Sequence, residues 1–398
     1  MGVKPVVGLG IAGARWRRSV LTLSLLGATA CGLVFSPGEY TDVGGVEPVA
    51  TVEDASAPVI AEAGADAPTP AAARIVLFAG QRALFPGEQT MQPWVAETIH
   101  TTVSADGELG AWRWDIAPPR VWPWTAAAIF GGVLWLQTDW SVHRVGFDGG
   151  IAGDWRSFSP LAVVSLPERS LRPWIGEAGV LFAGGFVDGE PTRNVYQSPF
   201  TGEGDLGPLV ALEASQLAAA RASAVLHRHG RFLYAVGGRT SLSDDDRGSN
   251  AVDVTSIGED GLPGPFVETS ALDLGSPDAP HGLVSTSIAS GAGHLVVVGG
   301  WTTGQPSSLT DVVLAARIDE ATGMLGSWTV LPRFPTPVGA AAVFVVANTI
   351  FVFGGMTPAD ATDAVMALPI HADGTFGSEW KRVGSLPGPR AWLAGVVY

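Results

Sequence analysis

The sequence predicts an all-β protein built from six repeated four-stranded units, and three observations predict it. A hydrophobic run ending in two glycines recurs along the chain, a turn joining a glycine to a large apolar residue recurs with it, and the two ends of the repeated region hold complementary strands. The clearest unit is Val338 to Gly355, in which apolar runs at 341–346 and 350–353 flank the turn Ala347-Asn348-Thr349. Two such runs joined by a short turn are typical of a β-hairpin.

The paired glycines define the repeat. They stand at Gly184-Gly185, Gly237-Gly238, Gly299-Gly300 and Gly354-Gly355, and the second glycines lie 53, 62 and 55 residues apart. Internal similarity at such a period indicates a repeat architecture. The runs before the glycines are almost continuously apolar, as expected of strands covered on both faces. Glycine there permits a positive φ and the close approach of another backbone.

The second recurring element is a turn with a glycine and a large apolar residue, which occurs six times and therefore indicates six units. Its copies are Gly110-Ala111-Trp112, Gly153-Asp154-Trp155, Gly207-Pro208-Leu209, Gly264-Pro265-Phe266, Gly326-Ser327-Trp328 and Gly377-Ser378-Glu379-Trp380. A proline or an arginine often stands between this turn and the next hairpin. These lead-ins are Pro119-Arg120, Arg172-Pro173, Arg221, Pro280-His281, Pro337-Val338 and Pro389-Arg390.

Together these features resemble kelch repeats, which build β-propellers. The resemblance covers roughly residues 74–398 and implies a six-bladed propeller with four antiparallel strands per blade. It is specific for the fold and implies little about activity, because propellers host enzymes, receptors and interaction platforms alike.

The two ends of the repeated region are expected to complete one blade together. Arg74 to Gly80 reads as a second strand without a first, and Gly388 to Tyr398 reads as a first strand without a second. Pairing of Val396 with the strand around Val76 would close the ring and protect its edges. One unit is irregular: in 125–138, Gly131-Gly132 form the hairpin turn and Gln137-Thr138 are expected in place of the double glycine.

The first 73 residues carry an export signal and a linker. Residues 1–30 combine basic residues, an apolar run and small residues, which is typical of a signal peptide. The sequence Leu26-Gly27-Ala28-Thr29-Ala30-Cys31 resembles a bacterial lipobox, which implies acylation of Cys31; an ordinary cleaved signal is the alternative. Residues 31–73 are rich in Ala, Pro and acidic residues and predict a flexible tether. We therefore expect a lipoprotein of the outer membrane, the cell surface or the periplasm.

Charge and cysteine content exclude several functions. The chain has 23 basic and 38 acidic residues, and removal of the signal, which holds four basic residues, leaves 19 against 38 and a net charge of −19. Nucleic acid is an improbable partner for such an acidic chain. The copper site of kelch enzymes that resemble galactose oxidase needs a cysteine crosslinked to tyrosine, whereas the single cysteine here is Cys31. We expect no cofactor and no bound metal.

The candidate ligand site is the mouth of the central channel. It comprises the lead-in arginines, the tryptophans beside them and one histidine, namely Arg120, Trp122, Trp124, Arg172, Trp174, Arg221, His281, Arg390 and Trp392. Arginine and aromatic faces can hold a carboxylate or a sugar ring. In the alternative interpretation the arginines bond loop carbonyls and the tryptophans brace the channel. A different set, Trp112, Trp155, Trp328 and Trp380, is expected to pack between blades.

No catalytic residue is identified by a motif, so a non-catalytic binding or interaction module, displayed on the cell envelope as a monomer, is the favoured function. Its partner would be a protein or a small acidic or sugar ligand. The alternative is a cofactor-free isomerase resembling six-bladed kelch mutarotases and acting on an acidic sugar. His227 and His229 alternate by one residue in an expected hairpin turn and could face the same side, but the residues near them in the sequence complete no metal-ligand set.

Overall fold

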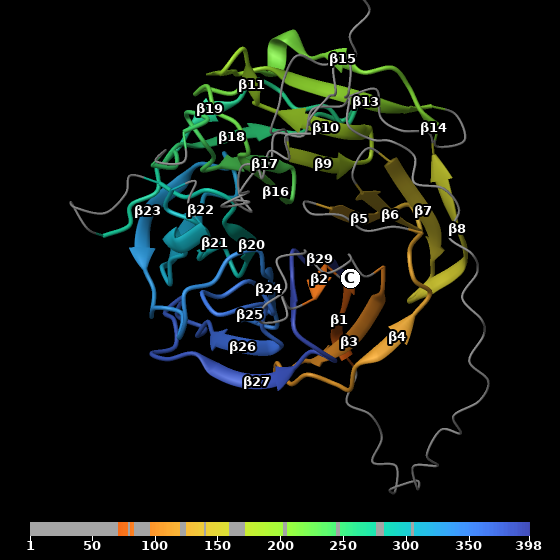
Figure 1. Ribbon diagram of the computed structural model, residues 1–398, viewed down its shortest axis with the longest axis vertical. Helices are drawn as coiled ribbons and strands as arrows, with labels where there is room; N and C mark the ends of the chain where they lie inside the picture. The colour runs from red at the N-terminus through yellow and green to blue at the C-terminus, as the bar shows by residue number, and fades with distance from the viewer. Residues whose placement is uncertain are drawn as a thin grey trace, which may run out of the picture.

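Six antiparallel sheets surround a central axis as the blades of a β-propeller (Figure 1). The computed structural model describes residues 71–78, 80–82, 96–119, 125–138, 141–158, 172–201, 205–243, 247–275, 282–303 and 306–398. The elements in these ranges are strands and two short 3-10 helices, η2 (Glu213–Ser215) and η3 (Pro306–Ser308). The predicted fold class is confirmed.

The blades are numbered I to VI in chain order, and their strands are listed from the axis outwards. Blade I contains β29 (Ala394–Val397), β1 (Ala71–Phe78), β3 (Thr98–Ser104) and β4 (Arg113–Asp115). Blade II contains β5 (Ala126–Phe130), β6 (Val133–Thr138), β7 (Ser141–Phe147) and β8 (Ile151–Phe158). Blade III contains β9 (Arg172–Gly176), β10 (Gly179–Ala183), β13 (Val195–Thr201) and the two short outer strands β14 (Asp205–Leu206) and β15 (Val210–Ala211).

The remaining three blades are regular. Blade IV contains β16 (Val225–His229), β17 (Phe232–Val236), β18 (Val252–Ser256) and β19 (Val267–Glu268). Blade V contains β20 (Ser287–Gly291), β21 (His294–Val298), β22 (Val313–Ile318) and β23 (Leu325–Val330). Blade VI contains β24 (Ala342–Val346), β25 (Thr349–Phe353), β26 (Ala364–Pro369) and β27 (Lys381–Ser385). Two small ribbons pair β2 (Gln81–Arg82) with β28 (Arg390–Ala391), and β11 (Phe186–Val187) with β12 (Glu190–Pro191).

The ring closes through the strand pair predicted from the sequence. β29 pairs antiparallel with β1, and Val76 lies opposite Val396. The last residue adds to this closure: the Tyr398 ring packs edge-on against Phe147 of blade II at 4.6 Å, and its hydroxyl donates to the Gly149 carbonyl. The ends of the described chain therefore hold blades I and II together.

The double glycines connect each blade to the next. In blades III to VI the first glycine donates its N–H to a carbonyl at the start of the third strand of its own blade. The second glycine donates to the lead-in of the following blade. The lead-in carbonyls that accept are those of Arg221, Leu283, Val338 and Arg390, at 3.0, 2.9, 2.8 and 2.8 Å. A Cβ on the first glycine would lie only 1.9 to 2.5 Å from the same carbonyl oxygens. Glycine is therefore required for the backbones of adjacent blades to approach this closely.

Blade II departs from this pattern as expected, with one correction of register. Gly131 and Gly132 form the β5–β6 turn, and Gln137 pairs with Ala126 at the position that precedes the first glycine in other blades. Thr138, and not Gln137, therefore takes the place of the first glycine. Its hydroxyl lies 2.9 Å from Nε2 of His143, which is itself hydrogen-bonded to Ser157.

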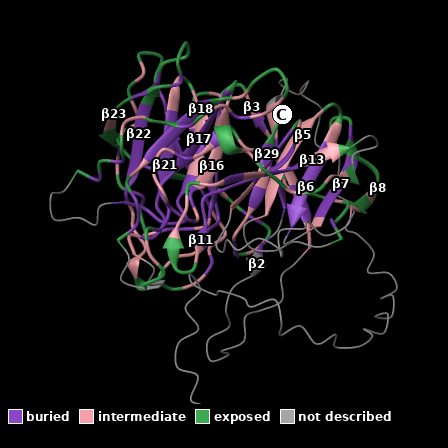
Figure 2. Cartoon of the chain, turned by 90° about the horizontal axis from the view of Figure 1, so that it is seen from above, coloured by how far each residue is buried: buried purple, intermediate pink, exposed green. Residues whose placement is uncertain are grey.

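The tryptophans of the outer turns pack between blades, which confirms their predicted role. Trp112 of blade I meets Phe353 of blade VI edge-on at 6.0 Å, and Trp155 of blade II meets Phe78 of blade I at 6.2 Å. The Trp328 indole donates to the Ser270 carbonyl beyond blade IV at 2.8 Å. Burial is highest in the second strands such as β10 and β17, whereas the outer strand β8 is largely exposed and the innermost strands β5 and β16 are half-buried; Figure 2 colours residues by burial.

The N-terminal predictions concern residues that lie outside those the structure describes. The expected signal, Cys31 and most of the expected tether fall in residues 1–70. β1 begins at Ala71, slightly before the expected start of the propeller at Arg74. Within the described ranges, no helix is long and apolar enough to cross a membrane.

Candidate functional site

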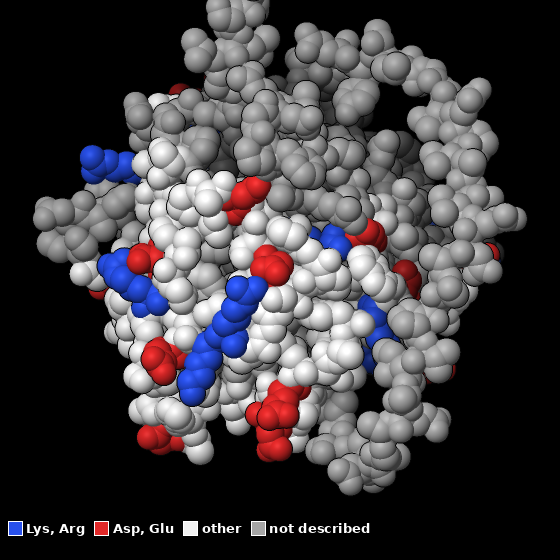
Figure 3. Space-filling view, turned by 60° about the horizontal axis from the view of Figure 1, so that its bottom comes forward, with Lys and Arg blue, Asp and Glu red and all other residues white. Residues whose placement is uncertain are grey.

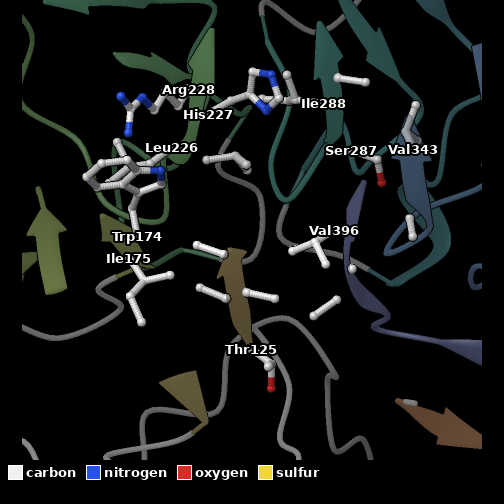
Figure 4. A pocket seen from close by; sticks show the side chains of 18 of the residues that line it. Thr125, Trp174, Ile175, Leu226, His227, Arg228, Ser287, Ile288, Val343 and Val396 are labelled. Atoms are coloured by element: carbon white, nitrogen blue, oxygen red, sulfur yellow. The ribbon is translucent and has the colours of Figure 1, made fainter. Parts of the chain in front are cut away.

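The innermost strands of all six blades enclose a cavity of about 600 Å³ along the axis. Its lining comes from β5, β9, β16, β20, β24 and β29 and the residues next to them, and it consists mainly of alanine, valine, isoleucine and serine (Figure 4). Among the residues that the structure describes, the charged members of this lining are Arg172, Glu177 and Arg228. A concave, largely apolar site with a few polar groups is the usual form of a small-molecule site.

The lead-in end of the channel contains Arg172. This residue is the first of β9 in blade III, yet its guanidinium donates to the hydroxyl of Ser285, which precedes β20 in blade V. The side chain therefore links blade III to blade V past the intervening blade IV. Trp174, two residues further along β9, also lines the cavity and is buried (Figure 4). Two of the predicted site residues thus meet in one cavity.

Trp392 lines the same end of the cavity from the lead-in of β29. Its ring stacks on Trp301 with centroids 5.6 Å apart and planes at 11°. Its backbone has φ of 58°, and Ser223, Ser285 and Ala340 hold the same position of other blades with φ of 53°, 50° and 52°. A left-handed non-glycine residue costs of the order of 1 kcal/mol, so this turn is maintained by its surroundings.

Arg221 and Arg390 lie away from the cavity lining. Arg221 has no exposed surface and forms an ion pair with Asp253, Nη1 to Oδ2, at 2.8 Å, besides donating to the carbonyls of Ala219 and Ala235. Arg390 is equally buried and lies 2.6 Å from the Glu97 carboxylate. Both side chains are therefore held within their own blades, Arg221 by a carboxylate and two carbonyls and Arg390 by a carboxylate.

The structure corrects the equivalence of the lead-ins. Arg172 pairs with Ala183, as Val225 pairs with Val236, so it corresponds to Val225 and stands four positions later in the repeat than Arg221. In blade V the position of Arg221 belongs to Leu283, whose carbonyl accepts from Gly238, and not to His281. Prolines and arginines alone do not fix this register, because lead-in length varies between units.

The other predicted site residues cannot be placed. Arg120, Trp122, Trp124 and His281 all lie outside the described residues.

The opposite end of the channel holds a polar cluster that the sequence did not reveal. His227 Nε2 and His229 Nδ1 lie 2.8 and 3.0 Å from the hydroxyl of Ser290, which is on β20 of the next blade. His229 Nε2 lies 3.2 Å from both oxygens of Glu320. Burial, and to a lesser extent the charge of His229, lowers the pKa of His227 to about 4. The alternation of the histidines was the only available signal, because Ser290 is remote in sequence.

Beside this cluster, Arg228 forms an ion pair with Glu177 in which one guanidinium nitrogen contacts both carboxylate oxygens. The Arg228 Nη1 lies 2.7 and 2.6 Å from the two carboxylate oxygens. The guanidinium lowers the pKa of Glu177 against the opposing effect of burial, which is the largest single influence. These two charges offset each other within the lining. Among the described residues, no group of three or more His, Cys, Asp or Glu is arranged to hold a metal ion.

Outside the channel, basic and acidic side chains are interspersed. On the face shown in Figure 3, lysines and arginines lie among aspartates and glutamates rather than in one patch. Several form surface ion pairs, such as Arg333 with Asp311 at 2.5 Å and Arg382 with Asp363 at 3.0 Å. Such exposed pairs contribute at most about 1 kcal/mol each.

Comparison with known proteins supports the fold alone. No protein-family model and no curated protein matches the sequence. Among solved structures, the chain is similar to one described as "Structure of YjhT", with a TM-score of 0.51 and 12% identity over 69% of this chain and 87% of the other. The architecture and this similarity define the chain as a six-bladed β-propeller.

Proposed function

We propose that the protein is a binding module that holds a small ligand with a carboxylate group at the lead-in end of its central channel. The supporting observation is the guanidinium of Arg172, which lies across a cavity of about 600 Å³ between blades III and V. The described lining therefore holds the guanidinium of Arg172 besides the ion pair of Glu177 and Arg228. Arginine binds carboxylates through two parallel hydrogen bonds.

The aromatic residues beside Arg172 would hold the rest of the ligand. Trp174 and Trp392 both line this cavity, and apolar residues dominate the strands around them. An acidic ligand with an apolar or ring-shaped body would bury that body on these surfaces. A sugar acid or an aromatic or aliphatic carboxylate would fit this chemistry.

Thermal unfolding of the full chain in the presence of candidate ligands tests this function. The panel contains acidic sugars, neutral sugars and simple carboxylates, since ligand bound to the native state raises its stability by mass action. We expect one or more carboxylates to raise the melting temperature, and Arg172→Ala to remove the shift. Arg172→Lys should retain part of it, because lysine keeps the charge but not the paired hydrogen bonds.

The matched control is Arg333→Ala, which removes a surface arginine that is 61% exposed and paired with Asp311. This variant should show the full ligand shift. Equal shifts for wild type and Arg172→Ala would refute the site at Arg172. Absence of any shift would instead favour a protein partner bound by the loops.

A mutarotase-like isomerase acting on an acidic sugar is the second candidate function. It is favoured by the presence of a cation, tryptophans and the neutral imidazole of His227 in one channel. Exchange between the two anomers, measured by NMR for any acidic sugar that binds, would test it. An exchange rate equal to that without protein would exclude this activity.

We also propose that the chain is a kelch-like propeller displayed on the cell envelope as a monomer. The contact of each double glycine with the next blade supports a kelch-type repeat, and the lipobox-like sequence before Cys31 supports a lipid anchor in the outer membrane. Metabolic labelling with a fatty acid should modify the wild type and not Cys31→Ser. Equal labelling of both would refute the anchor.

A further inference from the structure

The cluster at the hairpin end of the channel forms a directed hydrogen-bond chain across two blades. It runs from Glu320 through His229 and Ser290 to His227, which is labelled in Figure 4. Glu320 follows β22, while the histidines belong to β16 and Ser290 to β20. The order carboxylate, imidazole, hydroxyl is the order in which a serine nucleophile is activated.

The direction of this chain follows from its carboxylate. Ionised Glu320 can only accept, so His229 carries its proton on Nε2 and leaves Nδ1 as an acceptor. Ser290 then donates its O–H to His229 Nδ1, and its oxygen accepts the Nε2–H of His227. His227 stays neutral because burial lowers its pKa to about 4, so a single N–H is available from this ring on that side.

The geometry points to an acyl-transfer site in which Ser290 attacks an ester bound in the channel, His229 takes the serine proton, and Glu320 orients His229. Ser290 lines the cavity, so a substrate in the channel can reach its hydroxyl. His227 donates an N–H to the attacking oxygen over 2.8 Å, which holds the hydroxyl in the orientation that points its proton at His229.

Each step balances with water as the co-reactant. Ser290 Oγ bonds to the acyl carbon while its proton moves to His229 Nδ1, and the carbonyl oxygen becomes an oxyanion. Collapse breaks the bond to the alcohol oxygen, which leaves with the proton from His229. Water then attacks the acyl-serine, gives a proton to His229, and releases the acid as Ser290 recovers that proton.

The lining selects the substrate class. Ile288, Val343 and Val396 project into the cavity near the axis (Figure 4), and they offer apolar surface to an acyl chain. A cavity of about 600 Å³ suits a short or medium ester and excludes a folded protein substrate. This site lies at the opposite end of the channel from Arg172 and requires no ligand there.

Covalent labelling gives the first test. The full chain is treated with a fluorophosphonate probe, which reacts with activated serines, and the modified peptide is identified by mass spectrometry. We expect the adduct on Ser290, no labelling of Ser290→Ala, and full labelling of Ser327→Ala. Ser327 is the control because it is an exposed serine of the same blade, on the outer strand β23, and is not part of the cavity lining.

Hydrolysis of p-nitrophenyl acetate and butyrate gives the second test. Ser290→Ala and His229→Gln should lower kcat at least 100-fold. Glu320→Gln should lower kcat about 10-fold with KM unchanged, and Glu320→Asp should restore part of the loss, as expected of a positioning residue. Absence of an adduct on wild-type Ser290, or equal hydrolysis by wild type and Ser290→Ala, would overturn the assignment, and the first outcome is read on the wild type alone.

Discussion

The position of an arginine in the repeat decides what that arginine can do. Arg221 stands in the lead-in, where its backbone carbonyl accepts from Gly185 and its side chain turns into the blade to meet Asp253. Leu283 and Val338 occupy the same position in other junctions, so the junction tolerates an ion pair or an apolar side chain. Burial of a paired charge is often no more stabilising than a well-packed apolar residue. Arg172, four positions later, reaches the channel instead.

At this scale, His227 should make stability depend on pH. Its pKa is about 4 in the folded protein and near the ordinary 6.5 in the unfolded chain, so between these values the unfolded chain binds more protons. The share of folding stability that depends on a neutral His227 is fully present above pH 6.5 and is lost as pH falls towards 4. Between pH 7.5 and 4.5 the unfolding free energy of wild type should therefore fall by about 1–2 kcal/mol more than that of His227→Gln. This figure is below the full value for the pKa difference because the ring faces the channel, where water screens its charge.

Urea unfolding at the two pH values measures this difference. Carboxylates that titrate elsewhere contribute equally to both proteins and cancel in the comparison. An identical pH dependence of wild type and His227→Gln would show that His227 is not neutral through burial.

At the scale of the element, the double-glycine turn is the unit that joins the blades. Its first N–H completes the pairing of its own sheet, and its second N–H bonds to the following blade. Both glycines have positive φ in blades III to VI. The same turn thus ends a strand and fixes the position of the neighbouring sheet, which explains why it recurs wherever blades are regular.

Comparing alanine substitutions at Gly299 and Gly230 should separate the two requirements of this turn, a positive φ and room for the carbonyl oxygen of the next blade. Gly299 has φ of 54°, and an added Cβ would lie 1.9 Å from the Val338 carbonyl oxygen. Gly230 has the same φ, but an added Cβ there meets nothing within 4 Å. Gly230→Ala should cost about 1 kcal/mol of unfolding free energy, from backbone conformation alone, and Gly299→Ala about 3 kcal/mol or more. Denaturant unfolding measures both, and equal losses would contradict the role of close approach.

At the scale of the molecule, the ring is closed by strands from the two ends of the repeat. β29 supplies the innermost strand of blade I and lines the channel together with five other inner strands. Closure removes the free edge that an open array of sheets would present. The channel, and both candidate sites in it, exist only because the ring is complete.

A charge introduced into the closing strand should therefore destabilise the whole ring. Val396 is 8% exposed and pairs with Val76, whereas the adjacent Val397 is 37% exposed. Val396→Asp should lower the free energy of unfolding by about 3 kcal/mol or more through burial of a carboxylate, and Val397→Asp by less than about 1 kcal/mol. Urea unfolding followed by tryptophan fluorescence measures both. Similar values for the two variants would mean that the closing strand adds little stability.

Much of the fold could be predicted from local patterns in the sequence. Continuous apolar runs, paired glycines and complementary ends specify strands, turns and the pairing of Val76 with Val396, because each depends on a short segment and on strand geometry. Local patterns did not predict the exact register at two places. Thr138, and not Gln137, takes the place of the first glycine in blade II, and Leu283, and not His281, is equivalent to Arg221. Register in a lead-in depends on which backbone reaches the glycines, and the lead-ins differ in length.

The sequence by itself determined six blades, a closed ring and the packing of the outer tryptophans between blades. Only the tertiary structure decided that Arg221 is buried against Asp253, that Arg172 of blade III bonds Ser285 of blade V, and that Ser290 meets two histidines. The physical reason is that strands and turns follow from neighbouring residues, whereas these contacts join side chains of different blades. Their partners are set by the way the blades pack around the axis.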